Sequence, residues 1–274
     1  MIDGIKIFDG HMHYIGRFKP RDESLVEFMD RYGIDKAAVT TLNQAANLDR
    51  ILKSNGNIGE KEYLEDFLRK EQYDHEDLRK IISKNPNKLF GFFWFNPKIA
   101  NEDDWKLLEK YIKDYHFKGI KTQWCVDLLD VPGDLLYLAE FCIDNDAPLF
   151  IHSGTGFFYQ KPVRAKDHYQ LARKYRELKL IIGHAAHTME HCINCLNYFS
   201  KMANVYFETS TSIPYGIMTL IKAMGSQRVI YGSDSPTANP PDIEINKILC
   251  LNLDKKSLEN VFYNNIIHLL GIEE

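Results

Sequence analysis

Short apolar runs of strand length recur along the whole chain, and each is followed by a segment with helical spacing. A run of roughly four to eight apolar or β-branched residues, bounded by turn-forming residues, is typical of a buried β-strand. The eight runs are IKIF directly before the first histidines, KAAVTTL from Lys36, KLFGFFWF from Lys88, FKGIKTQ from Phe117, APLFIHSG from Ala147, KLIIGHAAH from Lys179, NVYFETS from Asn204 and RVIYGSDSP from Arg228.

The segments between these runs place apolar residues at i, i+3 and i+4, as in SLVEFMDRYG, WKLLEKYIKDY, LLYLAEFCIDND and YGIMTLIKAMG. Such spacing predicts amphipathic helices, and strands that alternate with helices indicate a parallel sheet. Eight repeats match a closed (β/α)8 TIM barrel better than an open doubly wound sheet. The patterns IEINKILCL and SLENVFYNNIIHLLG predict extra C-terminal helices that close the bottom or the side of the barrel. Because no linker divides the sequence, we predict a single barrel domain over residues 1–274.

Composition and charge narrow the classes of partner. The chain is 45% hydrophobic and 26% charged, which is the balance of an ordinary globular protein. A net charge of −4 with scattered Lys and Arg argues against nucleic acid. No apolar run suggests a signal peptide or a transmembrane helix, and five cysteines, an odd number, fit a reducing compartment. We expect a cytoplasmic protein that acts on a small molecule without membrane partners, and we leave homo-oligomer formation open.

The stretch DGHMHYIG, from Asp9 to Gly16, carries two histidines separated by one residue. Because side chains alternate faces along a strand, His11 and His13 are expected to point the same way. So short a pattern also arises by chance, and it indicates a metal site only in the right structural context.

Three further polar residues follow other predicted strands. His152 comes after PLFI, His184 after LIIG and Asp234 after VIYGS. A single histidine in such a place is often a satisfied core residue. A (β/α)8 barrel, however, aims the C-terminal ends of all its strands at one volume, so the combination favours a shared site. Imidazole nitrogens with one carboxylate suit Zn²⁺ or a similar first-row ion, which lowers the pKa of bound water to about 7.

The motifs DGHMH, IHSG, IIGHAAH and YGSDSP occur in that order, each after an apolar run. Together they resemble the amidohydrolase superfamily of metal-dependent barrels. The closing segment ENVFYNNIIHLLGI is similar to the terminal helix of the amidohydrolase 2 branch, which includes the relatives of aminocarboxymuconate-semialdehyde decarboxylase. The resemblance spans the whole chain, and it is specific for the superfamily rather than for a substrate.

The resemblance implies one divalent ion, with Zn²⁺ expected and Mn²⁺ or Fe²⁺ as alternatives. The ligands that it implies are His11, His13, His152 and Asp234. It gives His184 the role of general base or acid, and Asp234 could also take the proton. Binuclear members of the superfamily carry a carboxylated lysine near the end of the fourth strand, where this chain has Lys121. Strand parity leaves the direction of Lys121 open, and we expect a second ion to be absent.

Other features are less specific. The residues that could line a pocket are Trp94, Asn96, Gln123, Trp124 and Ser153, with Arg164 as a partner for a substrate carboxylate. The polar residues interpreted as one face of a helix are His187, His191, Cys192 and Cys195, the cysteines forming a C-x-x-C without a second copy. Two segments, 43–59 and 156–160, are candidate lids, with plain loops or covers as alternatives.

Three hypotheses of function follow. The leading one is a metal-dependent hydrolase that acts on an ester, lactone or amide of a small molecule. The alternative is a metal-dependent non-oxidative decarboxylase, which the sequence does not separate from the first because both would use the same ion and ligands. A barrel that has lost catalysis and serves as a binding protein is the third, and the complete ligand set argues against it.

Overall fold

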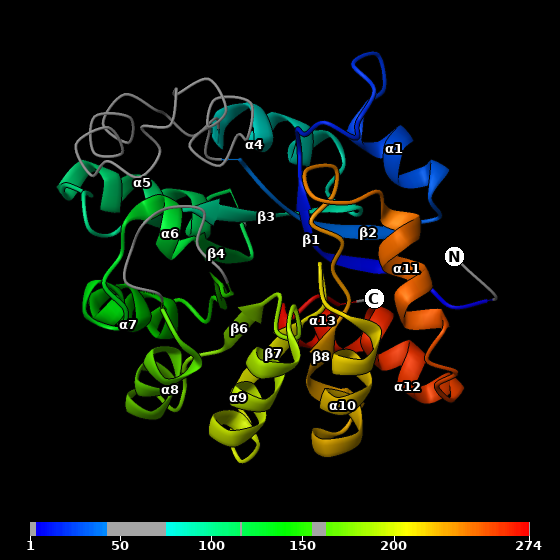
Figure 1. Cartoon of the computed structure of the whole chain (residues 1–274). Coiled ribbons are helices and arrows are strands. Elements are labelled where there is room, and N and C mark those ends of the chain that lie inside the picture. Colours follow the sequence, from blue (N-terminus) through cyan, green and yellow to red (C-terminus); the bar gives the residue numbers. More distant parts are fainter. Residues whose placement is uncertain (1–3, 43–74, 116, 155–162, 274) are drawn as a thin grey trace, which may run out of the picture.

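The computed structural model describes residues 4–42, 75–115, 117–154 and 163–273. In this part of the chain, eight parallel strands form one sheet in sequence order, surrounded by helices (Figure 1). The strands are β1 (Phe8–His13), β2 (Lys36–Thr40), β3 (Leu89–Trp94), β4 (Gly119–Thr122), β5 (Leu149–His152), β6 (Leu180–Gly183), β7 (Val205–Glu208) and β8 (Val229–Ile230). Both candidate lid segments, 43–59 and 156–160, lie outside the described residues.

The sheet closes where the chain after β8 meets β1. Gly10 donates its backbone N–H to the carbonyl of Tyr231 at 2.9 Å, and His13 donates to the carbonyl of Ser235 at 2.7 Å. Asp234 in turn donates to the carbonyl of His11 at 2.7 Å. These bonds complete a (β/α)8 barrel, which confirms the predicted fold class.

Two strand boundaries differ from the prediction. The first strand begins at Phe8, the last residue of IKIF, and continues to His13, because regular pairing with β2 starts at the Phe8 and Lys36 pair. The eighth strand ends at Ile230, so Asp234 lies in an irregular segment beyond it. Asp234 has a φ of 55°, a left-handed conformation that a regular strand does not accommodate.

The helices cover the outside of the barrel. They are α1 (Leu25–Arg31), α4 (His75–Lys84), α5 (Glu102–Lys113), α6 (Trp124–Asp127), α7 (Leu136–Asp144), α8 (Ala165–Lys174), α9 (Met189–Phe199), α10 (Pro214–Met224) and α11 (Pro241–Leu249). Their ends follow local sequence signals. At α5, for example, Asn101 accepts from the backbone of Asp103 and Asp104, and Asp104 accepts in return from Asn101, a reciprocal cap typical of a helix start.

Of the two predicted C-terminal patterns, IEINKILCL forms α11, and SLENVFYNNIIHLLG forms the helical elements that close the bottom of the barrel. They are α12 (Lys255–Glu259), a π-helical turn η5 (Asn260–Asn264) and α13 (Asn265–Leu269). Their apolar residues Tyr263, Ile266 and Leu269 join a buried cluster inside the barrel. The barrel residues of that cluster include Phe8, Phe90, Phe92, Phe150, Ile181 and Ile230. An apolar plug therefore fills the start of the strands, and the polar residues gather at their C-terminal ends.

None of the helices in the described ranges is long and apolar enough to cross a membrane.

Candidate metal centre

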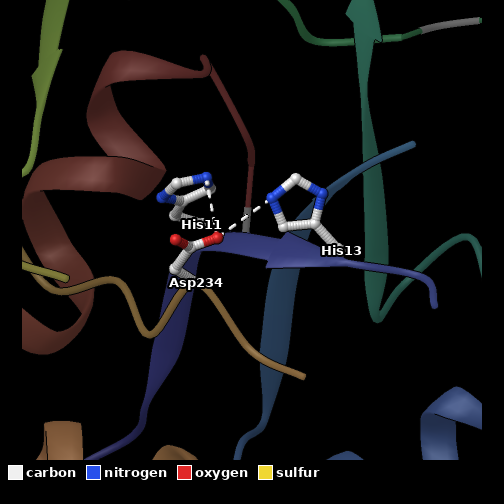
Figure 2. A group of neighbouring side chains, drawn as sticks. All are labelled: His11, His13 and Asp234. Atoms are coloured by element: carbon white, nitrogen blue, oxygen red, sulfur yellow. Dashed lines mark ion pairs between the residues drawn. The ribbon is translucent and has the colours of Figure 1, made fainter. Parts of the chain in front are cut away.

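His11, His13 and Asp234 converge at the C-terminal mouth of the barrel (Figure 2). The Nε2 atom of His13 lies 3.0 Å from Oδ1 of Asp234, and Nε2 of His11 lies 3.6 Å from the same oxygen. Both histidine side chains are buried, whereas Asp234 keeps 15% of its side chain exposed. The two imidazoles thus share one carboxylate oxygen, and the site retains access from the mouth.

Local backbone geometry explains this convergence. His11 and His13 alternate with Met12 along β1, so both imidazoles face the same side, as the sequence predicted. Asp234 and His184 have φ values of 55° and 56°, in the left-handed region that residues with a Cβ rarely adopt. Such conformations cost free energy and tend to occur at functional sites. The fold therefore maintains unfavourable backbone conformations at both of these positions.

The hydrogen-bond partners of His13 and His11 assign the protons on their rings. Nδ1 of His13 lies 2.8 Å from the carbonyl oxygen of Thr41, which can only accept, so Nδ1 donates and Nε2 is the nitrogen that faces Asp234. The Lys121 ammonium lies 3.2 Å from Nε2 of His11 and donates to it. The proton of His11 is therefore on Nδ1, and both rings direct Nε2 toward the centre.

His184 connects His152 to this group. Nδ1 of His184 lies 3.1 Å from the carbonyl oxygen of Ser210, so Nδ1 is the donor and Nε2 accepts. Nδ1 of His152 lies 3.0 Å from Nε2 of His184 and must then donate to it. This leaves the lone pair of His152 on Nε2. Nε2 of His184 also lies 4.0 Å from Oδ2 of Asp234.

Charges at the site match the protonation state that a metal ion requires. Burial, reinforced by Lys121, lowers the pKa of His11 to about 4, and burial together with His184 lowers the pKa of His152 well below its ordinary value. Burial alone would raise the pKa of Asp234, but His11 and His13 outweigh it and hold the pKa below its usual range. Neutral imidazoles and a charged carboxylate are the forms that bind a divalent ion. The residues present therefore fit the metal that the sequence motifs imply.

A second carboxylate, Glu208, was missed by sequence reasoning. It ends β7, is fully buried, and its Oε2 lies 3.4 Å from Nδ1 of His11. With His11 and His184 it forms another group of potential ligands within the described residues. The available signal was its place in NVYFETS, directly after a predicted strand, which is the same rule that selected His152 and His184.

Lys121 points into the barrel, which settles the strand parity that the sequence left open. Its Nζ atom lies 3.7 Å from the centroid of the Phe150 ring, and the same ring packs 4.6 Å from the imidazole of His11. Burial lowers the pKa of Lys121 to about 8, although Asp234 and Glu208 oppose this. At neutral pH Lys121 is therefore a buried ammonium group between the apolar plug and the metal centre.

Three of the residues predicted to line a pocket, Trp94, Asn96 and Gln123, form a hydrogen-bonded group beside His13. Nε1 of Trp94 donates to the Asp127 carboxylate at 3.0 Å, and the backbone N–H of Gln123 donates to it at 2.8 Å. The side-chain amide of Asn96 donates to the carbonyl of Asp127 at 2.9 Å. The Trp94 ring lies 6.2 Å from the His13 ring, so this group forms one side of the site.

The remaining predicted residues lie farther from the centre. Ser153 donates to the carbonyl of Gly183 at 2.5 Å and contacts His191, which lies on α9 as expected. Arg164 is exposed and precedes α8. Cys192 and Cys195 are free thiols buried on the inner face of α9, as the helix-face interpretation expected, whereas His187 precedes the helix.

A (β/α)8 barrel with histidines and a carboxylate converging at its C-terminal mouth defines the class of barrel enzymes built around a metal centre. A family model described as amidohydrolase matches residues 8–272. The chain therefore belongs to the amidohydrolase family, whose members depend on metal ions, and the motif-based resemblance is confirmed.

Solved structures share the fold. A 2,6-dihydroxybenzoate decarboxylase from Rhizobium is 13% identical, with a TM-score of 0.65 and 99% of each chain covered. A protein assigned as a 2-pyrone-4,6-dicarboxylic acid hydrolase from Pseudomonas putida is 13% identical, with a TM-score of 0.68 and coverage of 98% of this chain and 99% of its own.

A manganese-bound 5-carboxyvanillate decarboxylase from Novosphingobium aromaticivorans is 14% identical, with a TM-score of 0.66 and 98% of each chain covered. At these identities the likeness concerns the fold. The comparison with curated proteins gave no match.

Proposed function

We propose that this protein is a metal-dependent hydrolase that cleaves an ester, lactone or amide bond of a small molecule. The observation that carries the proposal is the convergence of His11 and His13 on one oxygen of Asp234, at 3.6 and 3.0 Å, at the mouth of an amidohydrolase-family barrel. One divalent ion would be held there. Its proposed ligands are His11, His13, His152 and Asp234.

Zn²⁺ is the ion that this donor set favours, because three imidazoles with one carboxylate suit it. Mn²⁺ and Fe²⁺ are the alternatives, and the manganese in one structural neighbour supports Mn²⁺. When bound, the ion would polarise a carbonyl group and make a water molecule more acidic. A single ion is expected. Lys121, the side chain that could bridge two ions, lies 3.2 Å from Nε2 of His11, and binding of the ion to that nitrogen would replace this contact.

The side chains of the chain itself would position the substrate centre and move protons. Asp234 directs Oδ1 at His11 and His13, while Oδ2 lies on the side of His184. A charged carboxylate in this place can accept a proton from the attacking water. Nε2 of His184 lies 4.0 Å from Oδ2 and accepts from Nδ1 of His152 at 3.0 Å, so its proposed role as the second proton carrier requires that contact to open first.

A non-oxidative decarboxylase is the second candidate. Two of the structural neighbours are decarboxylases, acting on 2,6-dihydroxybenzoate and 5-carboxyvanillate by their names, while a third is assigned as a hydrolase of a pyrone dicarboxylic acid. All three names denote carboxylated unsaturated rings. The buried ammonium of Lys121 would favour an anionic substrate in either reaction.

The experiment that separates the two supplies the metal-loaded protein with small lactones, esters, amides and carboxylated aromatics in H₂¹⁸O. A hydrolase incorporates one ¹⁸O atom into the product and releases no CO₂. Release of CO₂ without ¹⁸O in the organic product would assign the protein to the decarboxylases instead. Turnover that survives both metal removal and Asp234→Asn would contradict both candidates.

A further inference from the structure

Glu208 and Asp234 lie on opposite sides of the same two imidazole rings. For His11, Nδ1 lies 3.4 Å from Oε2 of Glu208, and Nε2 lies 3.6 Å from Oδ1 of Asp234. For His184, Nδ1 lies 4.0 Å from Oε2 of Glu208, and Nε2 lies 4.0 Å from Oδ2 of Asp234. Each ring therefore lies between the two carboxylates, with Nδ1 on the side of Glu208 and Nε2 on the side of Asp234.

The Ser210 hydroxyl fills the space between Glu208 and the two rings. It donates its single proton to Oε2 of Glu208 at 2.8 Å. The Ser210 oxygen lies 3.2 Å from Nδ1 of His11 and 2.9 Å from Nδ1 of His184, and because its proton is committed it must accept from both rings. The Nδ1–H form of each imidazole is thus the one that this group satisfies.

Glu208 is itself firmly held. It accepts from the backbone N–H of Ser210 and, at 3.1 Å, from that of His184, and its side chain has no solvent exposure. A Cβ atom at Gly232 would overlap Oε1 of Glu208, so glycine leaves the room that the carboxylate occupies. A buried carboxylate with this many donors has a fixed orientation, and it can fix what binds to it.

We propose that Glu208 and Ser210 are positioning residues that hold His11 and His184 by Nδ1, so that both Nε2 lone pairs face Asp234. Through the His152 contact on Nε2 of His184, they also set the proton of His152 on Nδ1 and free its Nε2. The inference rests on the proposed function only in placing the ion at Nε2 of His11 and Nε2 of His152. Partners of this kind on the outer nitrogen of a ligand histidine fix its tautomer and raise its basicity.

The alternative, that Glu208 binds a second ion with His11 and His184, conflicts with the contacts of His184. Nδ1 of His184 lies 3.1 Å from the Ser210 carbonyl and 2.9 Å from the Ser210 hydroxyl oxygen. The carbonyl oxygen requires a proton on Nδ1, and a protonated nitrogen cannot bind a metal ion. On this side of the two rings, the neighbouring oxygens accept hydrogen bonds from Nδ1–H, and no cation is expected to bind there.

The direct test is long-range ¹H–¹⁵N NMR of the metal-free protein with ¹⁵N-labelled histidine, comparing wild type, Ser210→Ala and Glu208→Gln. Ser212→Ala is the matched control, since Ser212 is also buried in this loop and its hydroxyl bonds to backbone atoms of Ala186 and Ser210. We expect His11 and His184 to be in the Nδ1–H form in wild type and in the control. Glu208→Gln offers an amide N–H donor to Nδ1, so a mixture with the Nε2–H form is expected there.

Zn²⁺ affinity, measured by chelator competition, is the second readout. We expect the dissociation constant to rise about 10–100-fold in Glu208→Gln and in Ser210→Ala, and to stay unchanged in Ser212→Ala. Circular dichroism checks folding. If loss of the Glu208 charge prevents folding of Glu208→Gln, the comparison of Ser210→Ala with wild type still tests the proposal.

Nε2–H forms in wild type, unchanged tautomers and affinity in both variants, or loss of one of two bound ions in Glu208→Gln would overturn the inference. If wild type binds no ion, the proposed function fails, while the tautomers still decide the role of Glu208 and Ser210.

Discussion

Nε2 of His13 lies 3.0 Å from Oδ1 of Asp234, and this contact joins the first strand to the segment that follows the eighth. The backbone bonds that close the barrel run through the same residues, since His13 donates to Ser235 and Asp234 donates to His11. The segments that close the barrel therefore also carry the residues of the candidate metal centre.

Asp234→Asn tests the chemistry of this contact. The amide keeps the shape of the side chain but loses the charge and the ability to accept a proton, so we expect turnover to fall by about 10²–10⁴-fold with the fold intact. Steady-state rates on a validated substrate, with circular dichroism as the check on folding, measure this. Asp242→Asn, an exposed acid in α11, is the control. Full activity in Asp234→Asn would remove Asp234 from the mechanism.

Gly232→Ala tests the packing around Glu208. The new Cβ would overlap Oε1 of Glu208 and lie 2.8 Å from Cβ of His11, so something must shift. We expect the free energy of unfolding to fall by about 1–3 kcal/mol in urea titrations, as overpacking of a core does. Gly133→Ala is the matched control, because a Cβ at that position would have no neighbour within 4 Å among the described residues. Equal stability of the two variants would argue against a tightly held Glu208.

Lys121→Met tests whether one or two ions bind. Two unit charges about 5 Å apart repel by roughly 3 kcal/mol at an effective dielectric constant of about 20, so loss of the ammonium should tighten Zn²⁺ binding at least about tenfold. Chelator competition and metal content measure this, with Lys118→Met on the same chain segment as the control. Loss of bound metal in Lys121→Met would instead indicate a carboxylated lysine that bridges two ions.

The buried His168 is expected to make the stability of the protein depend on pH. Neither ring nitrogen has a hydrogen-bond partner within the described ranges, and burial lowers the pKa to about 4 from 6.5. Between these values the unfolded chain binds more protons, so stability rises with pH and is lost on acidification. From pH 7 to pH 5 this one group should cost about 2 kcal/mol.

Urea titrations at both pH values check this prediction with His168→Leu. The variant should be more stable than wild type at pH 7, since it removes two unsatisfied polar atoms, and it should lose less stability at pH 5. His268→Gln, which replaces an exposed histidine, is the control and should follow wild type. A His168→Leu protein with the wild-type pH profile would show that the ring finds a partner or a proton in the folded state.

Much of the fold was predictable because it depends on local patterns. Apolar runs followed by amphipathic helices indicated the barrel, and period-two alternation placed His11 and His13 on one face of β1. Because a barrel directs the C-terminal ends of its strands at one volume, the positions of His152, His184 and Asp234 after predicted strands identified them as neighbours of the site. Nothing in the described residues tests their roles as ligands or catalysts, which stay predictions.

The rest depends on contacts between distant segments. Asp234 reaches the centre through a left-handed backbone beyond a two-residue strand, which hydrophobic periodicity does not encode. Glu208 ends β7 and Ser210 follows it in an ordinary sequence context, and their importance appears once the closed sheet brings them against His11 and His184. Lys121 required the actual register of β4, because either parity agreed with the pattern.

The most direct measurement is the metal content per chain of protein purified without added metal or chelator, beside the double variant His11→Ala, His13→Ala. We expect about one divalent ion per chain in wild type, namely Zn²⁺, and loss of that ion in the folded variant. Equal metal content in both proteins, or none in either even after reconstitution with Zn²⁺ or Mn²⁺, would contradict this expectation.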